Sequence, residues 1–193
     1  MSSALAIAAI TATLKALLED HLARQSVAAR VGDVAVTALP PDRLPTGAEE
    51  RSALNLFLYH VKPHARLRPL ATADGEPAAL TLDLFYLLAA YGQNDLHAEI
   101  LLGYAMQVLL ETAALTPATI EGAILRAGEH GHSAWVGDGT ADVHALAERT
   151  GPVEVSPEFL SVEETAKLWS ALQARYRPCA AYKVSSVVIQ RGQ

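Results

Sequence analysis

The sequence predicts an α+β fold in one domain spanning residues 1–193, with a mixed or antiparallel sheet of four to five strands flanked by three to four helices. Three observations predict this fold. An amphipathic helical repeat opens the chain, two long apolar runs of strand type follow it, and the chain closes on a strand, a helix and a last strand. At 193 residues and 51% hydrophobic content, the chain is long enough to bury a substantial core.

Helical periodicity is clearest in residues 4–25, where apolar residues recur at three- and four-residue steps: Ile7, Ile10, Leu14, Leu17, Leu18 and Leu22. Residues 31–37 alternate as a short strand, and prolines then make residues 39–52 a loop. A second helix is expected to begin at the N-cap residues Asn94 and Asp95 and to end near Ala114. It is apolar on nearly every side, which is typical of a helix that is deeply buried or partly covered by another subunit.

Two apolar runs are predicted to pair as antiparallel strands. Residues 53–61 are apolar on both faces, as in a central strand, and Pro63 breaks the run. Residues 80–90 begin with strict alternation of leucine and polar residues. The turn residues Asp74 and Gly75 lie between the two runs, so the connection is an oversized hairpin loop.

The second half begins with a helix predicted from Thr116 and Pro117 to about Ala127. Residues 128–151, rich in glycine and histidine, are predicted to be a variable loop region with a short helix near residues 141–148. After a strand near Val153, Ser161 and Glu164 have the three-residue spacing of a capping box. A terminal strand, residues 180–190, follows; its outer edge is expected to pair with a neighbouring subunit.

Charge and cysteine content exclude several classes of function. The net charge of −6 argues against binding of nucleic acid or of an anionic membrane. Cys179 is the only cysteine, so a reducing compartment is expected, and no run is apolar for long enough to span a bilayer. The apolar N-terminus lacks the basic flank of a secretory signal. We therefore expect a cytoplasmic protein.

Patterns typical of catalysis are missing from the sequence. Cys179 has no histidine near it in sequence, and neither a phosphate-binding loop nor a dinucleotide fingerprint occurs. The expectation is a protein that is not an enzyme and has no catalytic residue, cofactor or metal.

Histidine-rich segments leave one alternative open. His60 and His64 cannot share a helical face because Pro63 lies between them. A small metal-dependent enzyme would instead need convergent ligands from a loop that holds His130, His132, Asp138 and Asp142. The basic patch of Lys62, His64, Arg66 and Arg68 is interpreted as a solvated loop.

Candidate partner-binding residues lie near the C-terminus: Trp169, Tyr176, Tyr182, Val184, Val187 and Ile189. The last four belong to the terminal strand, and the two aromatic residues are expected to pack behind it. Trp169 and Tyr176, seven apart, share a face if the helix extends that far. They either pack this helix on the sheet or anchor a subunit contact.

Four segments, in order, resemble the N-terminal domain of tail-terminator, or cap, proteins of contractile injection systems, the phage-tail-like particles typified by the antifeeding prophage and the Photorhabdus virulence cassettes. They are LNLFLYHV (residues 54–61), LDLFYLL with AYG (82–88 and 90–92), ILLGYAMQ (100–107), and LWSALQ with YRP and YKV (168–173, 176–178 and 182–184). The resemblance runs from the first helix to about Ile189. Longer relatives continue beyond this domain, so any function of that extension is expected to be absent here.

The resemblance implies a structural protein. Such a protein forms a hexameric ring at the end of the particle distal to the baseplate, where it closes the inner tube and the last ring of sheath. A helical tube grows through head-to-tail contacts between two complementary surfaces. Growth stops when the last subunits offer only one of these surfaces, and a closed ring satisfies that requirement. Sheath, tube and further copies of the chain are then the expected partners. A monomeric adaptor that binds a peptide strand at a sheet edge is a second alternative.

Overall fold

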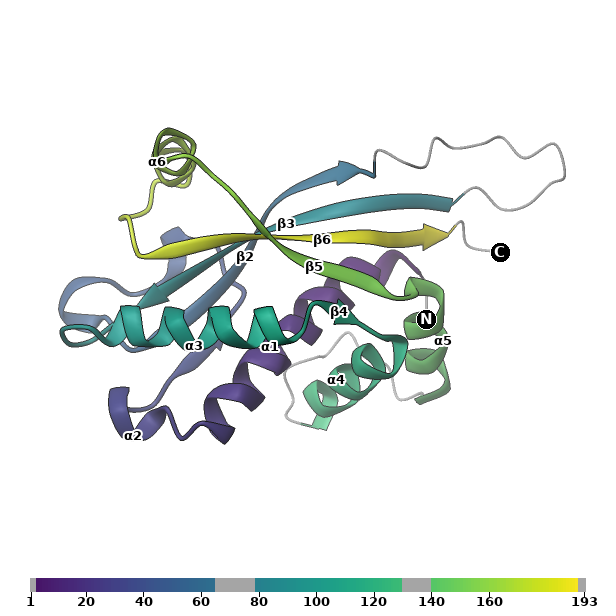
Figure 1. The fold of residues 1–193 in the computed structure, drawn as a ribbon, viewed down its shortest axis with the longest axis horizontal. Coiled ribbons are helices and arrows are strands. Elements are labelled where there is room, and N and C mark those ends of the chain that lie inside the picture. Colours follow the sequence, from purple (N-terminus) through teal and green to yellow (C-terminus); the bar gives the residue numbers. More distant parts are fainter. Residues whose placement is uncertain (1–2, 65–78, 130–139, 191–193) are drawn as a thin grey trace, which may run out of the picture.

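A computed structural model describes residues 3–64, 79–129 and 140–190 (Figure 1). Within them, six strands form one mixed sheet in the order β1-β2-β3-β6-β5-β4. β1 pairs in parallel with β2, and every other pair is antiparallel. The strands are β1 (Ala35–Thr37), β2 (Ala53–Pro63), β3 (Ala79–Tyr91), β4 (Ala114–Leu115), β5 (Val153–Glu158) and β6 (Cys179–Gln190).

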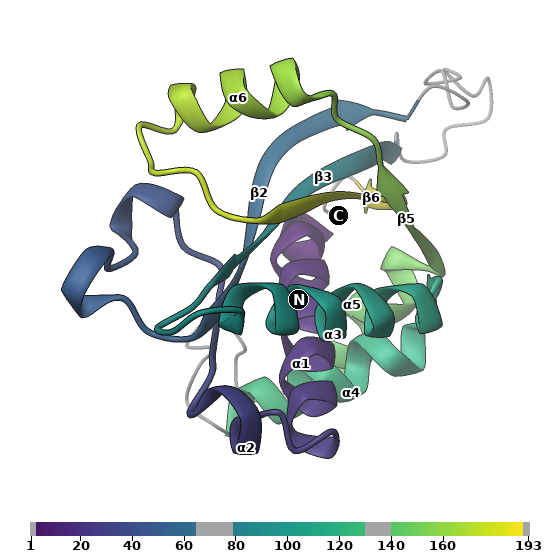
Figure 2. The same cartoon turned by 60° about the vertical axis from the view of Figure 1, so that its left-hand side comes forward.

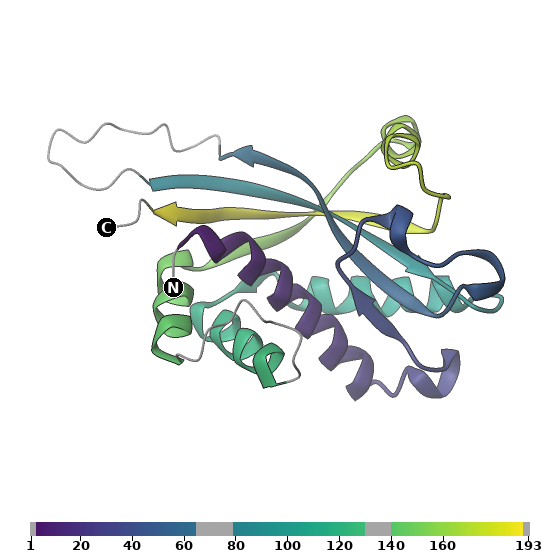
Figure 3. The ribbon, with the colours of Figure 1, turned by 180° about the vertical axis from the view of Figure 1, so that it is seen from behind.

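Helices cover the two faces of the sheet unequally. Four of them, α1, α3, α4 and α5, lie on one face, and α6 lies alone on the other (Figures 2 and 3). The described α-helices are α1 (Ala6–Arg24), α2 (Ala28–Val31), α3 (His97–Glu111), α4 (Pro117–Glu129), α5 (Thr140–Thr150) and α6 (Val162–Ala171). Short 3-10 helices precede α1 and interrupt the loop between β1 and β2: Ser3–Leu5, Pro41–Arg43 and Gly47–Glu49.

The α+β class is confirmed, but the element counts were too low. The described residues hold six strands and six α-helices instead of four to five and three to four. β4 has two residues and α2 has four, too few to produce a periodic pattern. Val31 ends α2, so the strand predicted from that residue is shortened to Ala35–Thr37. The helix predicted near residues 141–148 is present as α5.

Alternation along β3 builds two separate cores. Its even-numbered residues, from Leu82 to Ala90, join the main core under the four helices, together with Leu54 and Leu56 of β2. The odd-numbered Leu87, Ala89 and Tyr91 face the other way and pack with Trp169 of α6. The predicted pairing of residues 53–61 with 80–90 is confirmed, with a register shift between Leu58 and His60. Two-sided burial explains why β3 is apolar almost throughout.

α3 begins later than predicted. Its first residue is His97, and the preceding Leu96 adopts a left-handed conformation (φ 63°) with no side-chain capping hydrogen bond. Asn94 contributes only its carbonyl oxygen, which accepts the His97 N–H at 3.3 Å. The N-cap prediction for Asn94 and Asp95 was therefore wrong. The helix also ends at Glu111 because the chain extends into β4, which pairs with β5.

The turn into α3 is sterically tight. A Cβ atom added to Gly92 would lie 2.7 Å from the backbone nitrogen of Ala98 and 2.9 Å from Cβ of His97. Only glycine fits this close approach between the end of β3 and the first turn of α3. The position of α3 against the sheet therefore depends on this residue.

Candidate assembly surfaces

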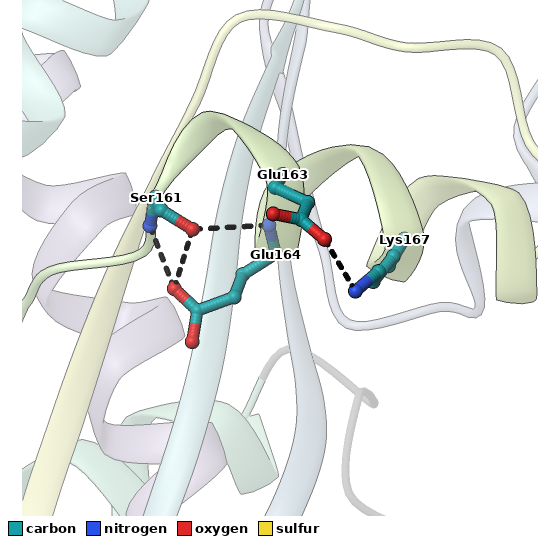
Figure 4. A network of polar contacts seen from close by, with 4 residues as sticks. All are labelled: Ser161, Glu163, Glu164 and Lys167. Atoms are coloured by element: carbon teal, nitrogen blue, oxygen red, sulfur yellow. Dashed lines mark hydrogen bonds and ion pairs between the residues drawn. The ribbon is translucent and has the colours of Figure 1, made fainter.

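The start of α6 is fixed by local hydrogen bonds (Figure 4). Ser161 Oγ accepts from the Glu164 N–H at 3.2 Å, and Glu164 Oε2 accepts from the Ser161 N–H at 2.8 Å. The predicted capping box is confirmed. The hydrogen bond from the Ser161 N–H, and then a second one from the Ser161 hydroxyl to Glu164 Oε2 at 2.8 Å, lower the pKa of Glu164. Glu163 adds an ion pair to Lys167 at 2.6 Å, so the exposed side of the helix is charged.

Trp169 attaches α6 to the sheet. It is 3% exposed and belongs to the smaller core, and its Nε1–H donates to Cys179 Sγ at 3.4 Å. α6 ends at Ala171, yet the Tyr176 ring still lies 5.8 Å from the Trp169 ring, between centroids, and Tyr176 is 61% exposed. Cys179 begins β6, and burial raises the pKa of its thiol. Trp169 is thus a packing residue, and Tyr176 carries the exposed aromatic surface.

The terminal strand is not an outer strand of the sheet. β6 lies between β3 and β5, and β5 pairs with it from Ala181 to Ser185. Val184 and Val187 are fully buried, Tyr182 is nearly so, and Ile189 is partly buried. The outer edge expected for this strand is therefore occupied by β5 over those residues. Partner binding by Tyr182, Val184, Val187 and Ile189 stays a prediction.

An open edge is instead found on β2. β1 pairs only with Ala53, Leu54 and Asn55, and the Asn55 side chain then binds the backbone of Leu39 through both its oxygen and its nitrogen. From Leu56 to Pro63, β2 pairs with β3 on one side and has no strand partner among the described residues on the other. Sequence reasoning placed this segment in the centre of a sheet. The signal it missed is Lys62-Pro63, because lysine and proline are typical of edge strands.

Side chains on the outer face of this part of β2 are aromatic and basic. The rings of Tyr59 and His60 lie 6.3 and 5.7 Å from that of Phe85, and Lys62 Nζ lies 5.0 Å above it. His64 Nδ1 is 2.7 Å from Asp83 Oδ1. Burial, and then the nearby Glu158 and Glu164, raise the pKa of Tyr59. Negative charge therefore also lies near this face, and Asp83 is directly opposite Lys62 in the pairing of β2 with β3.

A second exposed surface is apolar. A groove of about 230 Å³ lies between α3, the β5–α6 connection and the start of β6, lined by Met106, Pro157, Phe159, Leu160, Cys179 and Tyr182 among others. Phe159 is 91% exposed, and Leu110, one turn beyond Met106 on α3, is 77% exposed. The opposite side of α3 is buried through Leu101, Ala105, Val108 and Leu109. The helix thus has one buried side and one open apolar side.

Candidate metal ligands are only partly within the described chain. His130, His132 and Asp138 lie outside it, as do Arg66 and Arg68 of the basic patch. Asp142 lies in α5. In the described segments, no group of three or more His, Cys, Asp or Glu residues could hold a metal ion. His60 and His64 lie at the end of β2, where His64 binds Asp83.

A partly buried ion pair joins two distant segments near the smaller core. Arg177, before β6, forms an ion pair with Glu50, before β2, in which Nε and Oε1 are 3.1 Å apart. Arg177 also lies 5.6 Å from the Tyr91 ring. Burial raises the pKa of Tyr91 to about 12, although the Arg177 charge opposes this. The pair holds the loop before β2 against the α6–β6 connection.

No helix among the described residues is long and apolar enough to cross a membrane.

Two solved structures share the fold. One is the sheath/tube terminator, in the extended state, of an extracellular contractile injection system, PVC: TM-score 0.58, 16% identity, covering 97% of this chain and 57% of that one. The other is the cap of the anti-feeding prophage, described as a tube-terminating cap: TM-score 0.52, 19% identity, covering 90% of this chain and 54% of that one. The chain thus spans somewhat more than half the length of each. Comparison with curated protein sequences found no match.

The family comparison covers nearly the whole chain. The model of the Pvc16 N-terminal domain matches residues 9–193, a range that includes every described strand and all of the described α-helices except the first turn of α1. The resemblance drawn from residues 54–61, 82–92, 100–107 and 168–184 is confirmed. The chain belongs to the Pvc16 N-terminal domain family.

Proposed function

We propose that this chain is a structural, non-enzymatic cap domain that terminates the tube and sheath of a contractile injection particle at the end distal to the baseplate. The family match over residues 9–193 carries the proposal. The two structures that share its fold, described as a sheath/tube terminator and a tube-terminating cap, support it. Its partners are then the tube and sheath proteins, and it is made in the cytoplasm and incorporated into the particle.

The cap acts as a hexameric ring in this proposal. Each subunit of a cyclic ring must offer two different complementary surfaces to its neighbours. The apolar side of α3 and the exposed surface around Tyr176 lie on different elements and supply these two contacts in the proposal. A tryptophan-anchored α6 places Tyr176 at the surface, where aromatic residues often dominate binding energy.

Particle length tests this function. Particles assembled without the protein should have tubes and sheaths of widely varying length, and supplying the protein should restore a narrow length distribution, measured by electron microscopy. An unchanged distribution without it would contradict the cap function. If the ring forms in solution, light scattering of the purified protein should show six times its 20.5 kDa mass. If the ring closes only on the particle, six copies should be found at the capped end of each particle.

Metal analysis separates this proposal from an enzyme. The purified protein is expected to hold no stoichiometric transition metal. One bound ion per chain, lost on replacement of His130 and His132 by alanine, would favour the metal-dependent alternative instead.

A further inference from the structure

We infer that the open edge of β2, from Leu56 to Pro63, accepts an extended segment of a partner protein whose side chains alternate between acidic and apolar. This goes beyond the cap function, because it names the chemistry of a segment that this edge recognises. Three features of β2 support this inference: the direction of its backbone groups, the side chains on its two faces, and the residues that limit its pairing.

Hydrogen-bond alternation shows which backbone groups point outward. The His64 N–H donates to the Thr81 carbonyl at 2.9 Å, and Lys62 is paired with Asp83 one step along the same ladder. Because bonded and non-bonded pairs alternate in an antiparallel ladder, Val61, which precedes Lys62 and lies opposite Leu84, directs its N–H and C=O away from β3. Pro63 is in the same outward position and has no N–H. A partner strand can therefore bond to Val61, and pairing ends at Pro63.

The two faces of this edge differ in chemistry. His60 and Lys62 are exposed on the outer face, above Phe85. Val61 and Leu58, on the face toward the main core, are apolar, and Val61 is 38% exposed. A strand added here places alternate side chains beside these two sets. Acidic residues beside His60 and Lys62 and apolar residues beside Val61 complement both.

The same residues disfavour pairing with a second copy of this strand. β2 carries no aspartate or glutamate, and its polar residues near the open end, His60 and Lys62, are basic; like charges directly opposite each other across two strands are destabilising. Lysine, proline and a bulge are the features by which natural sheets protect an edge against self-association, and β2 has all three. They leave an acidic strand as the favoured occupant.

A short synthetic peptide of alternating valine and glutamate, with a fluorescent label, tests the inference on the full chain. Fluorescence anisotropy should show binding that weakens with salt, and a peptide of alternating valine and lysine should not bind. Val61→Pro removes one outward donor and should weaken binding about tenfold. Val61→Thr keeps the donor and a β-branched side chain, so it should bind like the original protein.

Charge reversal provides the second arm. Lys62→Glu should weaken binding at least about twofold to fivefold, whereas Lys167→Glu, on the exposed side of α6, should have no effect. Equal binding of acidic and basic peptides, or unchanged binding by Val61→Pro, would overturn the inference. Stronger binding of single-stranded oligothymidine than of the acidic peptide would also overturn it. None of these outcomes bears on particle length, so the cap function is tested separately.

Discussion

The two faces of the sheet are stabilised in different ways. One face lies under four helices and forms the larger core, whereas the other is covered by α6 alone through a small cluster around Trp169. Burial on the first face accounts for most of the hydrophobic stabilisation of the fold. The second face leaves Tyr59 of β2 partly exposed and His60 and Lys62 of the same strand exposed. The difference indicates that one face holds the fold together while the other is free to meet partners.

The same substitution on two strands gives the largest expected contrast. Val184→Pro places proline in β6, between β3 and β5 and beneath the helices, and should cost more than about 3 kcal/mol or prevent folding. Val61→Pro, on the open side of β2, should cost less than about 1 kcal/mol. Urea unfolding followed by circular dichroism measures both. Comparable losses for the two variants would contradict the assignment of β2 as an edge.

Removing the anchor of α6 tests the smaller core alone. Trp169→Ala deletes a buried indole. If α6 unfolds together with the rest of the protein, this substitution should lower the free energy of unfolding by about 3–5 kcal/mol. If α6 detaches by itself, global stability changes less and limited proteolysis cuts within residues 159–178. Tyr176→Ala is the control and should cost under about 1 kcal/mol, because Tyr176 is exposed. A wild-type proteolysis pattern combined with wild-type stability in Trp169→Ala would show that α6 does not depend on this residue.

The two faces each bury a tyrosine, and the two tyrosine hydroxyls differ in their hydrogen bonding. Tyr86 OH is 2.8 Å from Thr11 Oγ1 on the helix-covered face, so Tyr86→Phe should cost about 1 kcal/mol. Tyr91 OH, on the other face, is buried without a hydrogen-bond partner in the described structure, so Tyr91→Phe should be neutral or slightly stabilising. Thermal denaturation of both variants decides between these signs. A marked loss in Tyr91→Phe would reveal a partner for that hydroxyl.

The cap of α6 should give the smallest effect, and one that depends on pH. The pKa of Glu164 is lowered in the folded protein, so its contribution is complete above the unfolded pKa of glutamate and is lost as pH falls through the folded value. Glu164→Gln should therefore lower the urea midpoint slightly at neutral pH and leave it unchanged in strong acid. The neighbouring Glu163→Gln keeps the capping box and serves as the matched control. A difference between Glu164→Gln and the original protein that persists in acid would rule out this electrostatic origin.

Local features of the fold were predictable, and the order of the sheet was not. Ser161 and Glu164 predicted the start of α6 because a capping box depends on neighbours three residues apart. The antiparallel pairing of residues 53–61 with 80–90 followed from their alternation and from the turn residues between them. By contrast, β6 is inserted between β3 and β5 by contacts distant in sequence, and three residues of β1 decide how much of β2 is left open.

The candidate surfaces show the same division. Trp169 was correctly considered as a residue that packs its helix on the sheet, because burial of a tryptophan flanked by helical periodicity is common. The edge of β2 was missed because the same apolar sequence pattern occurs in a central strand and in an edge strand whose neighbour is too short to cover it. Only Lys62 and Pro63 distinguished the two.

Gly92 has a consequence for how substitutions in this protein are interpreted. A side chain there would collide with backbone atoms of the first turn of α3, so nearly every replacement should reduce the amount of folded protein. In a deep mutational scan for particle assembly, this position would therefore score among the least tolerant, like a contact residue. Its intolerance reflects the space between a strand and a helix, and a parallel measurement of protein abundance would separate the two causes.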